Sequence, residues 1–252
     1  MNVGSLFSGI GGLDLGLERA GMHVIWQSEI DPYACRVLAK HWPHVPNLGD
    51  VTLIDWSTVE RPDIVCGGFP CQPVSETGSH LGTEDDRWLW PEFARCLGAL
   101  RPRFALVENV SGLLTANDGG AMGDVVGGLA DLGYDAEWSL VSACSMGASH
   151  TRDRLFVVAH RDTRGQQAGW SGGGGDGEPM AGWREHPEHL HPFAFPRDGA
   201  LGRADWPAEP GVGRVADGLS DELDRYRLRC LGNAVVPQVA EWIGQQIMKA
   251  AA

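Results

Sequence analysis

The stretch Gly67–Ser75 (GGFPCQPVS) constrains the fold more than any other part of the sequence. It follows a short apolar run, Asp63–Cys66, and it presents Cys71 between Pro70 and Gln72. An apolar run that ends in two glycines and a proline is typical of a buried strand followed by a stiff loop. Open α/β sheets place their ligands at the carboxyl ends of such strands. We therefore expect Cys71 to lie at a functional site, although a lone intracellular cysteine is more often buried and inert.

The composition fits one sizeable α/β core with a small appendage, since the chain has 252 residues and is 43% hydrophobic. No apolar run approaches the ~18 residues of a membrane span, and the N-terminus has no signal-peptide pattern. We therefore expect a cytoplasmic protein with no membrane segment. The six cysteines form no CxxC pair and no Cys/His cluster at zinc spacing, which predicts reduced thiols and no metal site. The net charge of -13 means that any nucleic-acid contact must come from a local basic face.

A glycine turn follows the first apolar run of the chain. Val3–Phe7 predicts a strand, Ser8–Gly12 a turn and Leu13–Ala20 a helix. Such a turn lets the backbone approach a ligand closely, although nucleotide-type sites and purely structural turns share it. Glu29 ends the next predicted strand, about twenty residues after the turn, where a carboxylate can bind ribose hydroxyls. The alternative is a solvated carboxylate at the start of the helix that begins near Asp31.

Other polar residues follow predicted strands and offer further candidates. Asp50 could accept a hydrogen bond from an adenine amino group, or it could be an ordinary turn aspartate. Glu108 ends the apolar run Phe104–Val107 on the same rim as Cys71, so it is a candidate proton donor, with a structural carboxylate as the alternative. Further helices are predicted over 33–41, 88–100 and 121–132, and further strands over 23–27, 137–142 and 155–159.

Two arginines, Arg152 and Arg154, stand at alternate positions just before the last predicted strand. In an extended segment they would point to the same side, which suits anion or carbonyl recognition. The alternative is a solvated turn of arginine and aspartate.

The composition changes between residues 161 and 224, where Gly, Pro, Trp and His dominate and periodicity is lost. Such a region is either a disordered insertion or a recognition surface built from loops. We predict a catalytic and cofactor-binding domain over 1–160, a small separate region over 161–224, and a C-terminal segment over 225–252 that returns to the first domain. A terminal amphipathic helix is predicted over 238–249.

Eight segments occur in the order found in DNA cytosine-C5 methyltransferases, and the chain resembles the compact members of that family common in bacteria and their phages. The segments are SLFSGIGGLDLGLERAG, SEIDPYA, GDVT, GGFPCQPVS, DDRWLWPEF, VENV, TRDRLFVVA and RLRCLGNAVVPQVAEWI. The resemblance implies a Rossmann-like fold that uses S-adenosylmethionine, with a mostly parallel, doubly wound sheet. It also implies that residues 161–224 form the irregular target-recognition region.

The resemblance also implies a role for each matching residue. Cys71 would add to C6 of a flipped-out cytosine, Glu108 would protonate or hydrogen-bond N3, and Arg152 and Arg154 would hold the nucleotide through its phosphate and carbonyl oxygen. The positions that would bind S-adenosyl-L-methionine are Phe7, Gly9, Ile10, Gly12, Glu29, Ile30, Asp50, Val51, Pro70, Leu89 and Asn233. The implied partner is double-stranded DNA, with a cognate restriction endonuclease as an optional second partner, and we expect a monomer.

Three positions depart from the family pattern. Ser5 stands where an acidic residue is usual, His150 where a glutamine usually precedes the arginine pair, and Trp88 where a glycine is more usual. Alternative functions are an RNA (tRNA) cytosine-C5 methyltransferase and a catalytically inactive DNA-binding relative. A nicotinamide-dependent oxidoreductase would explain the glycine turn only, and it leaves Cys71 and Glu108 without a purpose. No linear code relates the side chains of residues 161–224 to a DNA sequence.

Overall fold

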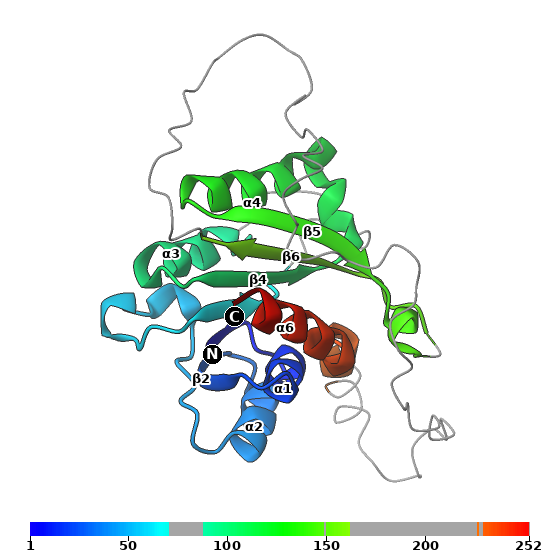
Figure 1. The fold of residues 1–252 in the computed structure, drawn as a ribbon. Helices are drawn as coiled ribbons and strands as arrows, with labels where there is room; N and C mark the ends of the chain where they lie inside the picture. The colour runs from blue at the N-terminus through cyan, green and yellow to red at the C-terminus, as the bar shows by residue number, and fades with distance from the viewer. Residues whose placement is uncertain (71–87, 149, 162–225, 227–228, 252) are drawn as a thin grey trace.

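The computed structural model describes residues 1–70, 88–148, 150–161, 226 and 229–251 (Figure 1). Cys71 lies outside the described residues, and so does the predicted target-recognition region apart from Arg161. The boundaries predicted for the three parts of the chain therefore stay predictions.

The described residues form a six-stranded sheet in the order β2-β1-β3-β4-β6-β5. Strands β2, β1, β3 and β4 run parallel to one another, whereas β6 runs antiparallel to both β4 and β5. The predicted mostly parallel α/β sheet is thus confirmed. The strands are β1 (Asn2–Leu6), β2 (His23–Ser28), β3 (Ile64–Gly67), β4 (Phe104–Asn109), β5 (Asp135–Val141) and β6 (Arg154–His160).

Helices cover both faces of this sheet, as expected for a doubly wound fold (Figure 1). Residue Asp31 caps the second helix, because its carboxylate accepts hydrogen bonds from the amides of Tyr33 and Ala34 and Pro32 follows it. The α-helices are α1 (Gly12–Arg19), α2 (Pro32–His41), α3 (Trp90–Leu100), α4 (Gly120–Asp131) and α6 (Pro237–Ala251), and two short 3-10 helices, η1 (Val51–Leu53) and η2 (Trp56–Thr58), follow α2.

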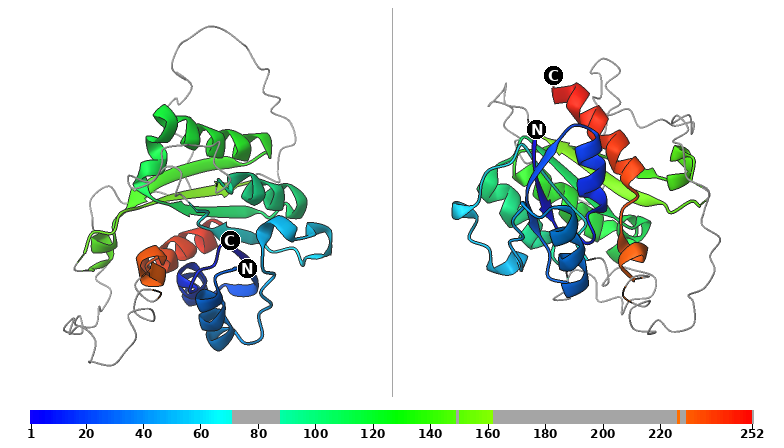
Figure 2. Two further views of the ribbon diagram at one scale, coloured as in Figure 1. Left: turned by 180° about the vertical axis from the view of Figure 1, so that it is seen from behind. Right: turned by 90° about the horizontal axis from the view of Figure 1, so that it is seen from below.

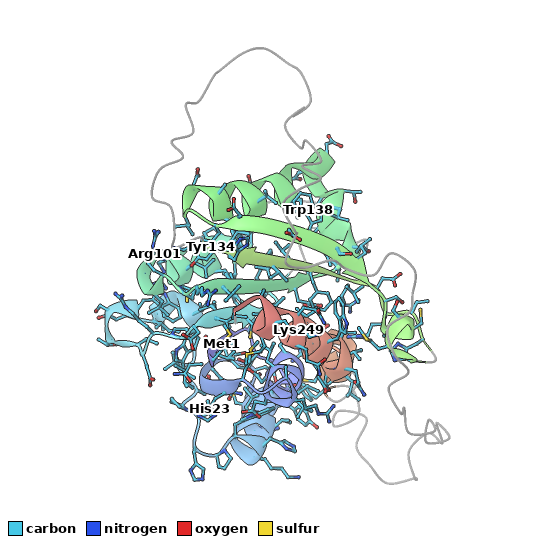
Figure 3. The ribbon with its side chains drawn as sticks, viewed as in Figure 1. Met1, His23, Arg101, Tyr134, Trp138 and Lys249 are labelled. Atoms are coloured by element: carbon cyan, nitrogen blue, oxygen red, sulfur yellow. The ribbon has the colours of Figure 1, made fainter. Side chains whose placement is uncertain are left out.

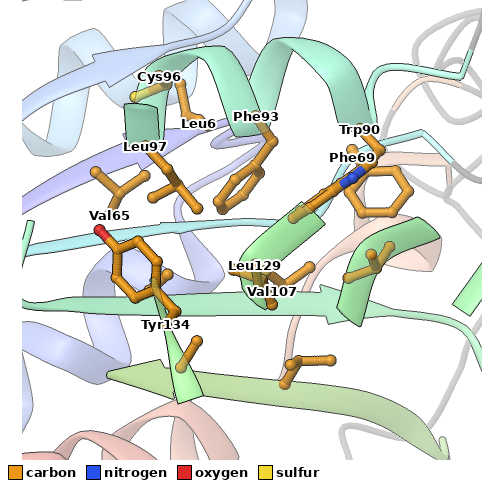
Figure 4. Packing of buried hydrophobic residues seen from close by; sticks show 14 of the residues in the cluster. Leu6, Val65, Phe69, Trp90, Phe93, Cys96, Leu97, Val107, Leu129 and Tyr134 are labelled. Carbon is orange, nitrogen blue, oxygen red and sulfur yellow. The ribbon is translucent and has the colours of Figure 1, made fainter. Parts of the chain in front are cut away.

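Each face of the sheet carries its own hydrophobic core. On one face, Phe93 and Leu97 of α3 and Leu129 of α4 pack against Val65 and Val107 (Figure 4). On the other face, α1 and α6 pack against β1, β3 and β4; the buried residues there include Val3, Leu17, Ile64, Leu106, Ile243 and Ile247. Strands buried on both sides read as continuous apolar runs, which is why the sequence predicts them well.

Helices α1 and α6 lie side by side although they come from opposite ends of the chain (Figure 2). Their contact is made by small residues, since a Cβ atom at Gly16 would lie 2.4 Å from Cβ of Ala240, and one at Gly244 would lie 2.8 Å from Cβ of Ala20. Helix α6 shares the core on one face of β1 and reaches it by packing on α1.

Element boundaries differ from the sequence predictions by small amounts. The short strand expected before Asp50 is reduced to a single bridge between Gln27 and Asn47. Strand β4 extends beyond the apolar run Phe104–Val107 through Glu108, which lies at the end of the strand as predicted, and Asn109. The hydroxyl of Tyr134 (Figure 3) joins the end of α3 to the start of β5 by donating a hydrogen bond to the carbonyl of Pro102 at 2.7 Å.

Among the described residues no helix is both long and apolar enough to span a membrane.

Candidate functional site

The antiparallel strand β6 places an arginine side chain at the edge of the sheet where the parallel strands end. Because β6 runs antiparallel to β4, its first residue, Arg154, lies next to the carboxyl end of β4. The Nε atom of Arg154 lies 3.1 Å from Oε1 of Glu108, whose side chain is almost entirely buried. Burial raises the pKa of Glu108 to about 7, and the positive charges of Arg154 and Arg152 limit this rise. A carboxyl group of this kind carries a proton part of the time at neutral pH.

The glycine after β3 allows this carboxyl group to reach the loop that leads toward Cys71. A Cβ atom at Gly68 would lie only 2.4 Å from Oε2 of Glu108. Asn109, next to Glu108, donates a hydrogen bond from Nδ2 to the carbonyl of Phe69 at 3.4 Å. The residues just before Cys71 are thus in direct contact with the end of β4.

Arg152 and Arg154 line the same pocket, and the positive charge of each lowers the pKa of Glu108, although Arg152 does not have the extended backbone that the prediction assumed. Arg152 has a left-handed backbone with φ of 37°. Its Nη2 atom donates hydrogen bonds to the carbonyls of Gly232 and Ala234, both at 2.6 Å. The alternation rule holds only for extended backbone, and residue 152 is not extended.

The glycine turn after β1 has the open backbone expected of a ligand site. Phe7 and Gly9 have positive φ values of 51° and 55°. A non-glycine residue in this region is strained, and such strain is typical of functional loops. No described atom lies within 4 Å of the position that a Cβ atom at Gly9 would take. The turn therefore leaves room for a ligand beside the backbone of Gly9.

Glu29 links the glycine turn to the end of β2. Its carboxylate accepts hydrogen bonds from the backbone amides of Gly9 at 2.7 Å and of Ile30 and Asp31 at 2.8 Å each. It is therefore neither free in solvent nor the cap of α2. A carboxylate has about four acceptor positions, so one remains for a ligand hydroxyl. The side chain of Ile30 is 67% exposed beside it, which gives an apolar surface that suits a heterocyclic ring.

Asp50 caps the short helix η1. It accepts hydrogen bonds from the amide of Thr52 at 2.9 Å and from its hydroxyl at 2.8 Å, and these bonds lower the pKa of the Asp50 carboxyl. Val51 is buried, and its carbonyl accepts a hydrogen bond from Arg95 at 2.6 Å. Asp50 is thus an ionised acceptor on a fixed turn, and its predicted contact with adenine stays a prediction.

Asn47 was missed by the sequence analysis, yet its side-chain amide joins the two loops that carry Glu29 and Asp50. Its Oδ1 atom accepts from the amides of Glu29 at 3.0 Å and Gly49 at 3.1 Å, while Nδ2 donates to the carbonyl of Glu29 at 3.0 Å. An asparagine shortly before a Gly-Asp turn was the available signal. This signal does not predict the contact with Glu29, because the pairing of Asn47 with β2 joins segments that are about twenty residues apart in the sequence.

The two flanks of residues 71–87 meet in the structure. The rings of Phe69 and Trp88 form an edge-to-face contact with a centroid distance of 5.1 Å. Trp88, where a glycine is more usual, therefore brings the segment's ends together. Pro70 is exposed beside Phe69, and Leu89 packs partly buried against the same core.

A pocket of about 880 Å³ opens between α1, α2 and the C-terminal segment. Of the predicted site residues, Ile10, Gly12, Arg152 and Arg154 line it, together with His150. Asn233 is exposed on the adjacent helical turn. The remaining described candidates do not line this pocket and stand at or near the carboxyl ends of β1, β2, β3 and β4 or at the start of α3: Phe7, Gly9, Glu29, Ile30, Asp50, Val51, Pro70, Leu89 and Glu108.

Ser5, the first departure from the family pattern, belongs to a buried polar row beneath α1. Gln27, Ser5 and Cys66 are register neighbours on β2, β1 and β3, and Asp14 of α1 faces them. Among the described residues, Ser5 Oγ, both carboxylate oxygens of Asp14 and Gln27 Nε2 lack a hydrogen bond of good geometry. Burial raises the pKa of Asp14 to about 7, and the charge of Glu18 adds to this rise. Asp14 of α1 is thus a buried acid next to Ser5, the position of β1 where the family usually has an acidic residue.

A mostly parallel α/β sheet with a glycine turn after its first strand and a buried acid on its rim defines the class of ligand-binding α/β enzymes. The family model for C-5 cytosine-specific DNA methylase matches residues 1–197, and the chain belongs to this family. The type II methyltransferase M.Eco47II of Escherichia coli is 39% identical over 161 residues, which are 62% of this chain and 39% of that protein. The type II methyltransferase M.NgoMIV of Neisseria gonorrhoeae is 37% identical over 60% of this chain and 49% of its own length. The match thus spans less than half of each relative.

Solved structures agree with this fold. A proposed DNA modification methyltransferase encoded within an Escherichia coli prophage superposes with a TM-score of 0.53 and 30% identity, over 64% of this chain and 47% of that one. Spodoptera frugiperda DNMT2 superposes with a TM-score of 0.55 over 65% of this chain and 50% of that one, and its identity of 20% supports the fold alone.

Proposed function

We propose that this protein transfers a methyl group from S-adenosylmethionine to C5 of cytosine within a specific double-stranded DNA sequence. The observation that carries the proposal is the buried pair of Glu108 and Arg154 at the end of β4, beside the loop that leads to Cys71. Family membership supports the same reaction.

The chemistry requires activation of an electron-poor ring. The thiolate of Cys71 adds to C6 of a flipped-out cytosine, and the carboxylic acid of Glu108 protonates N3, so that C5 gains enamine character. The guanidinium of Arg154 would donate to the carbonyl oxygen of the ring. Once C5 carries the methyl group, the C5 proton passes to water, the C6–S bond breaks to release Cys71 as the thiolate, and N3 returns its proton to Glu108, which frees the product.

The residues that would hold the cofactor fit its parts. The open backbone at Gly9, the remaining acceptor position of Glu29 and the exposed face of Ile30 suit a nucleoside, and the ionised Asp50 suits an adenine amino group. S-adenosylmethionine supplies an electrophilic methyl group on a sulfonium when it is bound.

The proposed target-recognition region, residues 161–224, would read the DNA sequence. Replacing this segment with that of a relative should change the methylated sequence and leave the chemistry intact. An unchanged target sequence would contradict the assignment. A monomer acting on DNA, with or without a partner endonuclease, is part of the same proposal.

The direct test is expression in a bacterial host without cytosine methylation, followed by bisulfite sequencing of its DNA. We expect protected cytosines within one recurrent short sequence, and their loss in Cys71→Ala. The matched control is Cys144→Ala, which removes an exposed thiol elsewhere and should leave protection intact. Protection that survives in Cys71→Ala would remove Cys71 from the reaction. Unmodified DNA with methylated cytosine in RNA would favour the RNA methyltransferase alternative.

A further inference from the structure

Whereas Arg154 pairs with Glu108, the side chain of Arg152 donates hydrogen bonds to the C-terminal segment. Both of its hydrogen bonds use Nη2 and end on the carbonyls of Gly232 and Ala234. These carbonyls close the helical turn 229–233, where the last C=O groups lack partners within the helix and attract a cation. The left-handed backbone of Arg152 is maintained at a cost, so the surrounding contacts must favour it.

The segment held by Arg152 is the wall that faces the glycine turn. The carbonyl oxygen of Val235 would lie 2.4 Å from a Cβ atom at Gly12, so the two backbones touch there. Arg229 anchors the same segment on the other side through an ion pair with Asp31, the cap of α2. Asn233, predicted to contact the cofactor, stands between the two residues that Arg152 binds.

Arg152 also stands between the two halves of the site. It lines the same pocket as Ile10 and Gly12 of the glycine turn, and its neighbour Arg154 pairs with Glu108. A single side chain therefore connects the wall of the expected cofactor pocket to the strand that carries the base-binding arginine.

We propose that Arg152 is a positioning residue that fixes residues 232–235 against the glycine turn and so shapes the side of the cofactor site that Gly12 and Asn233 form. This role differs from the phosphate contact that the family resemblance implies. It rests on the proposed function, because the ligand of the pocket is taken to be S-adenosylmethionine. The two roles predict different measurements, since a phosphate ligand acts on DNA binding and a positioning residue acts on the cofactor without DNA.

The test measures binding of S-adenosylmethionine to the full chain by calorimetry in the absence of DNA. Arg152→Ala should weaken cofactor binding by about tenfold or more, and Arg152→Lys should recover part of it, because an ammonium can still donate to these carbonyls. Arg154→Ala should lower methyl transfer, because Arg154 pairs with Glu108.

The matched control is Arg103→Ala. Arg103 also donates from Nη1 to a carbonyl of the C-terminal segment, that of Ala251, at 3.1 Å, but it lies far from the glycine turn in the sequence and outside the pocket lining. For each hydrogen bond lost, Arg103→Ala should lower thermal stability at least as much as Arg152→Ala does. It should not change cofactor affinity. If Arg103→Ala weakens the cofactor as much as Arg152→Ala, the effect is general destabilisation and the proposal is wrong.

The remaining outcomes are also decisive. Unchanged cofactor affinity in Arg152→Ala, with weaker DNA binding and a smaller salt dependence, would assign Arg152 to a phosphate instead. If Arg152→Ala fails to fold, the comparison of Arg152→Lys with the wild type and with Arg103→Ala gives the same discrimination. Failure of the wild type to bind the cofactor would contradict the proposed function itself, independently of Arg152.

Discussion

Asp14 and Glu108 are two buried carboxyl groups whose pKa is raised to about 7 by the same cause, burial, yet they lie in different surroundings. Glu108 stands at the end of β4 and faces the guanidinium of Arg154 at 3.1 Å. Asp14 is fully buried beneath α1, where the nearest charge, Glu18, is of the same sign. A raised pKa therefore reports burial in both regions. Position on the rim and a cationic partner distinguish the group that can act on a substrate.

The largest expected effect follows from Glu108→Gln. The amide cannot deliver a proton to N3, so the single-turnover rate of methyl transfer should fall by about two to four orders of magnitude. Cofactor binding should change little, because the described residues place Glu108 outside the glycine turn. Rapid-quench measurement with radiolabelled cofactor checks this, and an unchanged rate would contradict the N3 role.

Asp14→Asn separates the second carboxyl group from the first. The folded protein holds a proton on Asp14 up to about pH 7, whereas the unfolded chain releases it near the ordinary value of 3.8. Asp14 therefore favours folding below about pH 4, and this contribution is lost as the pH rises to 7. The total loss is on the order of 4 kcal/mol.

Removing this ionisable group should make Asp14→Asn more stable than the wild type at pH 8 and similar to it near pH 4. Urea unfolding at the two pH values measures the difference. Methyl transfer should persist in this variant. If it is lost as completely as in Glu108→Gln, the two carboxyl groups share a catalytic role and the distinction drawn above fails.

Gly16→Ala tests whether the α1 region acts through packing. The new Cβ atom would lie 2.4 Å from both Cβ of Ala240 and the carbonyl oxygen of Pro237, so we expect a loss of about 1–3 kcal/mol of stability. The control is Gly127→Ala in α4, where no described atom lies within 4 Å of the new Cβ and the helix should gain stability slightly. Equal effects at both positions would argue against close contact of α1 with α6.

Asn47→Ala should have the smallest effect. It removes the amide that joins the loops of Glu29 and Asp50, so cofactor affinity should fall about three- to tenfold with little change in the single-turnover rate. Asp55→Ala is the control, because Asp55 caps η2 as Asp50 caps η1 but outside the predicted site. A slower chemical step in Asn47→Ala would instead indicate that Asn47 acts on the reaction of the cytosine and not on cofactor binding.

The sequence predicted the sheet and the candidate acid because both depend on local patterns. Short apolar runs between glycine turns are read directly, and Glu108 follows such a run, so its place on the rim was expected. The limits of β4 were less clear, since Glu108 and Asn109 are polar and yet continue the strand through pairing with Phe156 and Leu155 of β6.

The contacts that hold the site together were not predictable because they join distant segments. Arg152 binds carbonyls about eighty positions later, and it does so from a left-handed backbone that no sequence pattern indicates. Asn109 contacts Phe69, and Trp88 packs on the same ring, across loops whose meeting follows from the packed sheet. Side-chain amides and strained dihedrals leave no periodic trace in a sequence.

The contact between Gly12 and the carbonyl of Val235 also has a consequence for synthesis. A ribosome adding ~5–20 residues per second needs roughly ten to forty-five seconds to pass from one of these residues to the other. During that interval the apolar side chains of α1, including Leu13 and Leu17, have no α6 to cover them. The core that α1 shares with α6 is therefore completed only after α6 has been synthesised, and the contact beside the glycine turn forms late.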